Sequence, residues 1–392
     1  MINTLKKHSI PCLIALALAS CSSIGDNSGS ELLVFNMDEK YDKKDILMSE
    51  IADIEYIPLQ SQDSFFYHWA IGHSRDYIVT YNYRNNDIVF FDKKGNPSHI
   101  VNKKGPGPDE YSSLITASYD GETDDLFVST YDRKIYVYDK LGNLKKIYDV
   151  KDKKFTTDFA NFGDDYIVCS HESSSADAIY MINKSTGEVE DISIPYEKEI
   201  NLSVVVEQNA NFISKRNLPK FTIFPKGDQI QLTEYSSDTI FLMDKNKEMT
   251  PVFVRQPKVS EQEVPKVIHG LMETDKYTYF VMQDKAYDVE KNVGFKETTF
   301  RYDKKKKEFT ELNVTLPDMT FEDNWNVSLN PRPIYYKQDP SGKYAGYGMK
   351  FLAGDMLAKK YEEGKIHGKL KEVYEQMADP EDGIAMMIYL RN

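Results

Sequence analysis

The chain has 392 residues, of which 62 are acidic and 49 are basic, and its formal net charge is −13. An acidic surface of this size repels the phosphates of nucleic acids and the headgroups of anionic lipids, so we expect no nucleic-acid partner and no membrane contact held by charge. The chain is long enough to bury a large hydrophobic core.

The N-terminus combines a short basic segment with an apolar run. Lys6 and Lys7 precede the apolar residues 10–19, a run shorter than the roughly 20 residues that span a bilayer. It ends in Leu18-Ala19-Ser20-Cys21, which is similar to the lipobox of bacterial lipoproteins. We therefore predict a signal peptide over residues 1–20 and lipid attachment at Cys21. An ordinary cleavable signal with a chance cysteine is the alternative.

Residues 21–31 are mostly small and polar, which predicts a flexible tether. Cleavage before Cys21 removes two lysines and no acidic residue, so the formal net charge moves from −13 to −15. Two or three acyl chains on one cysteine anchor a protein stably. We therefore expect a lipid-anchored protein of the cell envelope, on the outer membrane, and leave open whether it faces the periplasm or the cell surface.

Only one cysteine, Cys169, remains for the folded domain, because Cys12 leaves with the signal peptide and Cys21 carries lipid. No intramolecular disulfide is then possible. Cys169 lies in the apolar run 166–169, so we interpret it as a small buried hydrophobic residue.

Short runs of alternating apolar residues recur through the predicted folded domain, residues 32–392, and this is the periodicity of β-strands. One motif repeats five times along this domain. In each copy of the motif, a strand leads to a second strand that ends in Asp or Asn, and a lysine-rich turn follows. The Asp side chain caps this turn, and a glycine takes the positive φ that the turn requires. The expected strand pairs are 76–81 with 88–92, 125–130 with 135–139, 165–170 with 179–183, 228–232 with 240–244, and 277–281 with 299–303.

The spacing of these copies predicts a β-propeller. The residues that end the second strands lie 47, 44, 61 and 59 positions apart, and four short strands need segments of about this length. A β-sandwich is the chief alternative, but it would not repeat one motif five times. Strands expected at residues 51–59 and 384–392 would close the ring by pairing with each other. We predict an all-β, six-bladed propeller with four-stranded antiparallel blades, closed by its N- and C-terminal strands.

Several motifs together resemble a known family. They are the lipobox, the strand 54–59, the Phe-Asp-Lys-x-Gly turns, the loop 104–111 (Lys-Gly-Pro-Gly-Pro-Asp-Glu-Tyr) and the closing segment 379–389. The combination resembles the six-bladed β-propeller lipoprotein family of Gram-negative bacteria over nearly the whole mature chain. The turns alone are shared by NHL-type and other propellers. Because the function of this family is largely uncharacterised, the resemblance implies an architecture and an envelope location but no catalytic residue.

Two loops contain residue types that bind ions in other proteins. The prolines of the loop 104–111 remove N–H groups that a phosphate would need, so we interpret this loop as a stiff connection between blades. The acidic stretch 120–125 lacks the spacing of an EF-hand, and the histidines are scattered singly. The sequence therefore assigns no catalytic residue, no metal site and no cofactor.

The region from residue 324 to residue 378 is the least regular part of the chain. Residues 355–378 predict a helical insertion, which Gly364 and Gly368 weaken in its middle. Aromatic residues before it suit stacking on a sugar ring, although packing between blades is the alternative for each. The candidate ligand surface comprises Trp325, Tyr335, Tyr336, Tyr344 and Tyr347.

The sequence does not identify a ligand. We expect a binding or interaction module whose central funnel takes a polysaccharide, a peptide or an envelope protein. One alternative is a glycan lyase or glycoside hydrolase with acid and base on separate blades. Another is an envelope sensor or assembly factor. Convergent His, Arg and Tyr side chains, or two close carboxylates, would favour an enzyme, whereas an aromatic mouth poor in charge would favour binding.

Overall fold

The computed structural model describes most of the chain beyond the predicted signal peptide. Cys21 and residues 1–30 lie outside the described residues, as do Trp325, Tyr335 and Tyr336 of the candidate ligand surface. The described residues are 31–60, 69–82, 84–153, 155–171, 178–209, 212–218, 220–290, 293–320, 337–339, 341–379 and 382–392.

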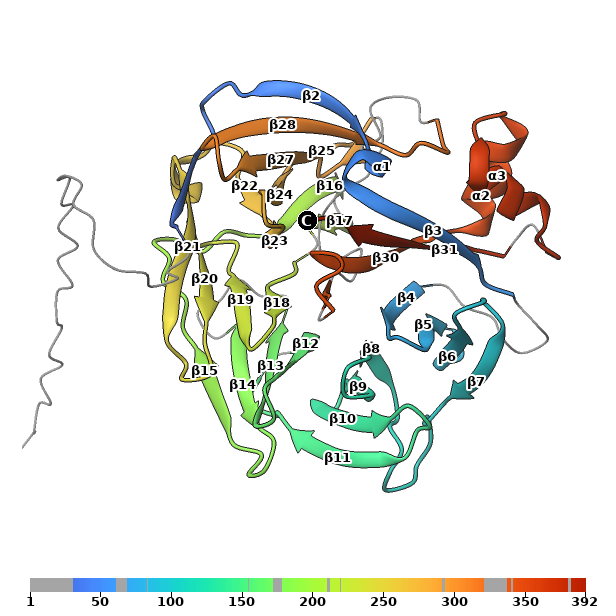
Figure 1. Cartoon of the computed structure of the whole chain (residues 1–392). Coiled ribbons are helices and arrows are strands. Elements are labelled where there is room, and N and C mark those ends of the chain that lie inside the picture. Colours follow the sequence, from blue (N-terminus) through green and yellow to red (C-terminus); the bar gives the residue numbers. More distant parts are fainter. Residues whose placement is uncertain are drawn as a thin grey trace, which may run out of the picture. The chain divides into compact units, whose positions relative to one another are not determined.

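Six antiparallel sheets follow one another around a ring, so the predicted six-bladed propeller is confirmed (Figure 1). Within each blade, strands are hydrogen-bonded to their neighbours in chain order, except where the chain ends meet. In blades 1 to 4 the first strands lie side by side, with that of blade 2 between those of blades 1 and 3, and that of blade 3 beside that of blade 4. Blade 1 contains β4 (Trp69–His73), β5 (Tyr77–Asn82), β6 (Asp87–Asp92) and β7 (Pro97–Val101). Blade 2 contains β8 (Leu114–Asp120), β9 (Asp125–Thr130), β10 (Lys134–Asp139) and β11 (Leu144–Asp149). Blade 3 contains β12 (Thr156–Phe162), β13 (Tyr166–His171), β14 (Ile179–Asn183) and β15 (Val189–Ile192).

The remaining three blades carry the additions to the regular pattern. Blade 4 contains β18 (Ile223–Lys226), β19 (Gln229–Thr233), β20 (Thr239–Met243) and β21 (Met249–Gln256), and the short helix η1 (Val259–Glu261) follows it. Blade 5 contains β22 (Lys266–Ile268), β23 (Met272–Glu273), β24 (Tyr277–Asp284), β27 (Glu297–Asp303) and β28 (Glu308–Thr315). Blade 6 contains β29 (Lys337–Gln338), β30 (Gly346–Leu352), β31 (Ile384–Leu390) and β3 (Ala52–Pro58).

The repeated motif of the sequence corresponds to the second and third strands of blades 1 to 5 and the turn after them. The Asp92 carboxylate accepts hydrogen bonds from the backbone N–H groups of Lys94 and Asn96 at 2.8 and 2.9 Å, and Gly95 has φ +81°. The equivalent carboxylate or amide oxygen caps the turn in the next four blades. The side-chain cap and the positive φ are therefore the physical basis of the repeat.

The ring closes as predicted, with β3 antiparallel to β31 along its whole length. Upstream of β3, the chain adds two strands that the sequence analysis did not predict. Strand β1 (Leu33–Asn36) pairs in parallel with β21, and β2 (Asp42–Leu47) pairs in parallel with β28. They cover the outer edges of blades 4 and 5, and the short helix α1 (Met48–Ile51) leads into β3. An outer edge that is already paired is not available for aggregation.

Six hydrophobic clusters hold the ring together, and each lies between two successive blades. Cys169 is fully buried between blades 2 and 3, as predicted, and burial raises the pKa of its thiol. The loop 104–111 connects blades 1 and 2. Its Glu110 carboxylate accepts a hydrogen bond from the Gly107 N–H at 2.8 Å, and the Tyr138 hydroxyl donates to the Asp109 carbonyl at 2.9 Å. These bonds support the interpretation of the loop as a stiff connection.

Candidate functional site

Three segments outside the blade pattern leave the ring at the same face. The first segment follows the fourth strand of blade 3 and contains the hairpin β16 (Ser203–Asn209) and β17 (Phe212–Asn217). The second follows the second strand of blade 5 and contains β25 (Tyr287–Asp288) and β26 (Val293–Gly294). The third follows the second strand of blade 6 and contains α2 (Gly354–Glu362) and α3 (Gly368–Glu375). Second and fourth strands run in the same direction in an antiparallel blade, so all three segments emerge on one face.

We call this side of the ring the insertion face, and the opposite side, which carries the capped Asp and Asn turns, the turn face. The third segment confirms the predicted helical insertion. It consists of two helices because Gly364 takes φ +68° at the end of α2.

Exposed apolar side chains concentrate on the insertion face. Of the thirteen exposed large hydrophobic side chains among the described residues, eight lie in connections that leave the ring on this side. Exposed apolar patches mark surfaces that meet a partner or ligand, so this face is the candidate binding surface. The eight are Tyr131, Phe155, Val205, Ile213, Val264, Val289, Val293 and Tyr361.

The two hairpins are anchored to the ring through one hydrophobic cluster. Ile200 and Leu218, at the base of the first hairpin, pack with Tyr235 and Val267 of blades 4 and 5. Phe295, beside the second hairpin, packs against the same cluster although its φ is +55°, a conformation that is rare for a bulky residue. The bases of both hairpins are therefore buried together, while Val205 and Val293 remain 49 % and 62 % exposed.

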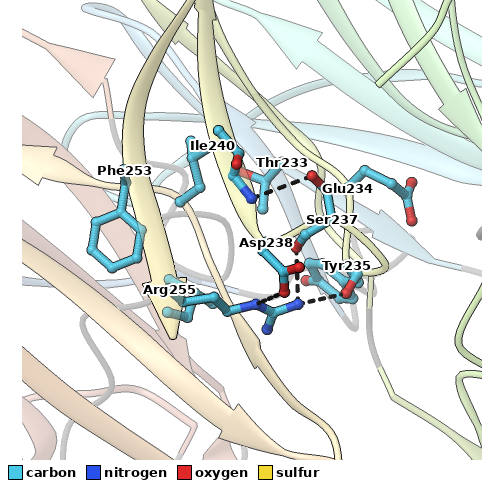
Figure 2. Close-up of a pocket in the computed structure, with 10 residues that line it drawn as sticks. Thr233, Glu234, Tyr235, Ser237, Asp238, Ile240, Phe253 and Arg255 are labelled. Carbon is cyan, nitrogen blue, oxygen red and sulfur yellow. Dashed lines mark hydrogen bonds and ion pairs between the residues drawn. The ribbon is translucent and has the colours of Figure 1, made fainter. Parts of the chain in front are cut away.

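A small cavity lies beneath this region, at the end of blade 4 (Figure 2). Its volume is about 10 Å³, so it holds at most one water molecule. The Arg255 side chain borders it and is 3 % exposed. Its guanidinium donates to the carbonyls of Tyr235 and Ser237 at 3.0 and 2.9 Å and to the Asp238 carboxylate at 3.3 Å (Figure 2). Burial lowers the pKa of Arg255 to about 10. Arg255 therefore braces the loop between β19 and β20.

Tyr235 also connects blade 4 to blade 5. Its hydroxyl lies 2.8 Å from Nδ1 of His269, and Nε2 of His269 lies 3.0 Å from the side-chain oxygen of Gln283. Burial raises the pKa of the Tyr235 hydroxyl and lowers that of His269. His, Tyr and Arg side chains thus converge here, which is the arrangement expected of a catalytic site. Tyr235 and His269 are 1 % and 0 % exposed, however, so their polar atoms face each other and not a substrate.

Charged groups pair on the turn face. Lys140 Nζ lies 2.8 Å from the Asp124 carboxylate, and Lys145 Nζ lies 2.5 Å from Asp125. Asn161 of blade 3 donates to the Asp120 carboxylate at 2.8 Å. The acidic stretch 120–125 is therefore used for contacts within and between blades. Among the described residues, no cluster of three His, Cys, Asp or Glu side chains is arranged to hold a metal ion.

Two of the five candidate aromatic residues lie in the described part of the chain, and both lie in blade 6. The loop that contains Tyr344 is on the turn face, where the Tyr344 hydroxyl donates to the Asp53 carboxylate at 2.8 Å. Tyr347 is half-buried and packs with the cluster between blades 6 and 1, its ring 5.2 Å from that of His73. Both rings also contact Tyr389. These contacts match the alternative in which the tyrosines pack within and between blades.

An exposed aromatic pair lies elsewhere, on the insertion face of blades 2 and 3. Tyr131 and Phe155 are 58 % and 43 % exposed, and their ring centroids are 5.5 Å apart. The sequence analysis missed this pair because the two residues are 24 positions apart in unrelated connections. The available signal was that Tyr131 directly follows a β-strand and Phe155 directly precedes one, so that both lie at the ends of blades.

Comparison with known proteins places this architecture in a family. The model of a family described as "Domain of unknown function (DUF4934)" matches residues 32–389. The chain belongs to this family. The match begins at Leu32, where the predicted tether ends, and a search of curated proteins finds no match for the DUF4934 chain.

Two of the solved structures with a similar fold come from Bacteroides. A putative exported protein of Bacteroides fragilis is 11 % identical, with a TM-score of 0.61, over 92 % of the DUF4934 chain and 100 % of its own. A member of the DUF4221 family from Bacteroides vulgatus is also 11 % identical, with a TM-score of 0.52, over 87 % and 98 % of the two chains. At these identities the likeness concerns the fold alone. None of the described helices is long and apolar enough to cross a membrane.

Proposed function

We propose that this protein is an envelope binding module, held to the outer membrane by lipid on Cys21, and that its insertion face meets the ligand or partner. The observation that carries the proposal is the concentration of three added segments and eight exposed hydrophobic side chains on one face. Loops and insertions on a rigid scaffold are where binding residues gather. The exported location of the Bacteroides fragilis protein of the same fold supports an envelope location.

The ligand classes that suit such a surface are polysaccharides, peptides and envelope proteins. The two hairpins have little conformational freedom, because their bases are packed against the ring. Binding then costs little conformational entropy, which favours recognition of a ligand without rearrangement of the fold.

The test is a binding screen that compares the two faces. The purified mature protein is screened against envelope glycans, peptidoglycan fragments and envelope proteins, and each ligand found is measured again with two variants. Val205→Ser with Val289→Ser alters the insertion face, and Leu141→Ser, whose side chain is 65 % exposed on the turn face, is the matched control. We expect only the first variant to weaken binding. If the affinity for a ligand falls only with Leu141→Ser, the binding surface is on the turn face and the proposal is contradicted.

A further inference from the structure

Tyr131 and Phe155 form a corner of two aromatic faces on the insertion face. Tyr131 follows β9 and Phe155 precedes β12, so blades 2 and 3 each contribute one ring. The ring planes meet at 69° with centroids 5.5 Å apart. Both rings are exposed, and they pack against each other across the two connections.

Arg133 supplies a positive charge at this corner. Its guanidinium lies 5.8 Å from the centroid of the Phe155 ring, and Nη1 donates to the Lys151 carbonyl at 2.9 Å. The neighbouring lysines are neutralised, because Lys134 pairs with Asp132 at 3.1 Å and Lys151 with Asp149 at 2.8 Å. Within the described ranges, no carboxylate lies at ion-pair distance from Arg133. Among the described residues of the corner, the Arg133 guanidinium is therefore a cation without an ion-pair partner, in a protein of net charge −13.

The backbone of Arg133 takes an uncommon conformation. Its φ is +58°, in the left-handed region that glycine and asparagine occupy at lower cost. The turn is held by hydrogen bonds from the Arg133 N–H to the Thr130 carbonyl and from the Val150 N–H to the Arg133 carbonyl. A glycine would make the same backbone bonds with less strain. Lys247 and Lys307 take similar values of φ in other turns, so the backbone tolerates arginine at this position but does not require it.

We propose that this corner binds a carboxylated pyranose, a uronic acid residue of an acidic polysaccharide. The inference rests on the proposed function and names its ligand class. The C–H face of the sugar lies against an aromatic ring, and the guanidinium binds the sugar carboxylate through two parallel N–H···O bonds. The charged residues around the rings favour a ligand that is apolar on one face and hydrogen-bonding at its edges over an apolar peptide segment.

The test is the affinity of the mature protein for defined oligosaccharides. The probes are oligomers of galacturonate, glucuronate and mannuronate, with neutral glucose and galactose oligomers of equal length for comparison. We expect at least one carboxylated oligomer to bind more tightly than its neutral counterpart, and we expect added salt to weaken this binding. Tyr131→Ala and Phe155→Ala each lower the affinity by roughly tenfold or more.

The variant Arg133→Gly distinguishes an effect on binding from an effect on folding. It relieves the positive φ, so the protein remains at least as stable, while the preference for the carboxylated oligomer is lost. Leu141→Ser, which alters an exposed apolar side chain of the turn face, leaves the affinity unchanged. The inference is overturned if none of the carboxylated oligomers binds, or if they bind equally well to the Tyr131, Phe155 and Arg133 variants. If a different ligand then binds, and Val205→Ser with Val289→Ser weakens its binding, the proposed function holds but the corner of Tyr131 and Phe155 is not its sugar site.

Discussion

At the scale of single residues, turn chemistry fixes the blade pattern. The turns of the first three blades place glycine at φ between +78° and +82°, at Gly95, Gly142 and Gly187. In blades 4 and 5 the same position holds Lys247 and Lys307, at φ +66° and +60°. The Asp or Asn cap is thus present in the turns of all five blades. Glycine is replaced where the surroundings leave room for a side chain.

A glycine can be required by its positive φ or by a lack of room for a Cβ, and Gly187 and Gly95 are examples of the two cases. A Cβ on Gly187 would meet no atom within 4 Å, whereas a Cβ on Gly95 would lie 1.8 Å from the Pro58 carbonyl oxygen of blade 6. We expect Gly187→Ala to lower the free energy of unfolding by about 1 kcal/mol through φ alone. Gly95→Ala should cost clearly more, because the backbone of β3 must also move. Urea unfolding of both variants measures the difference, and equal losses would refute a contact between Gly95 and β3.

At the scale of elements, local sequence predicted the blade strands but not the strands that depend on distant partners. The second and third strands of blades 1 to 5 were predicted because each pair repeats one alternation and one turn. Strand β2 has the sequence Asp-Lys-Lys-Asp-Ile-Leu and is exposed except at Ile46, so it shows no strand pattern. Its pairing with β28 joins residues more than 260 positions apart, and no local signal encodes that choice.

The candidate site shows the same limit. The sequence analysis expected aromatic residues near the helical insertion to form a ligand surface. Tyr344 and Tyr347 make contacts in blade 6, and an exposed aromatic pair that the sequence analysis did not name comes from two separate connections. Which aromatic side chains remain exposed depends on the packing of neighbouring blades. A single strand pattern does not contain this information.

Strand β1 buries Leu33 and Phe35, and Phe35 is the larger of the two. Phe35 is fully buried and contacts the rings of Phe253, Phe280 and Phe300, whereas Val34 on the same strand is 51 % exposed. We expect Phe35→Ala to lower the free energy of unfolding by about 3 to 5 kcal/mol and Val34→Ala by less than about 1 kcal/mol. Chemical denaturation checks both values. A small loss for Phe35→Ala would mean that β1 is dispensable for the core.

His269 links blades 4 and 5 and gives their contact a pH dependence. Burial lowers its pKa in the folded protein, while the unfolded chain has the ordinary value of about 6.5. The unfolded state therefore binds a proton more readily, and stability falls as the pH falls below about 6.5. His269→Gln should cost about 1 to 3 kcal/mol at pH 7.5, because Tyr235 or Gln283 loses its partner.

The variant should lose less stability than the native protein between pH 7.5 and pH 5. Denaturation of both proteins at the two pH values measures this difference. An identical loss in both would show that the pKa of His269 does not differ between the folded and unfolded states.

At the scale of the whole molecule, ring closure and the two faces follow from strand order. The pairing of β3 with β31 was predictable, because two apolar strands at opposite ends of a repeat array leave no other partner for the last blade. The spacings of 61 and 59 positions between turn markers reflect the segments that carry the two added hairpins. The number of blades and the direction of their strands then place these hairpins and the helices on one face.

The central claim is that the insertion face is the binding surface, and oxidative footprinting tests it most directly. Side-chain oxidation is compared between the purified mature protein and the same protein in its native envelope. We predict protection of Tyr131, Phe155 and Tyr361 in the envelope, with unchanged oxidation of Leu141 and Met249 on the side of the turn face. Protection of Leu141 and Met249 with full oxidation of the three aromatic residues would contradict the account.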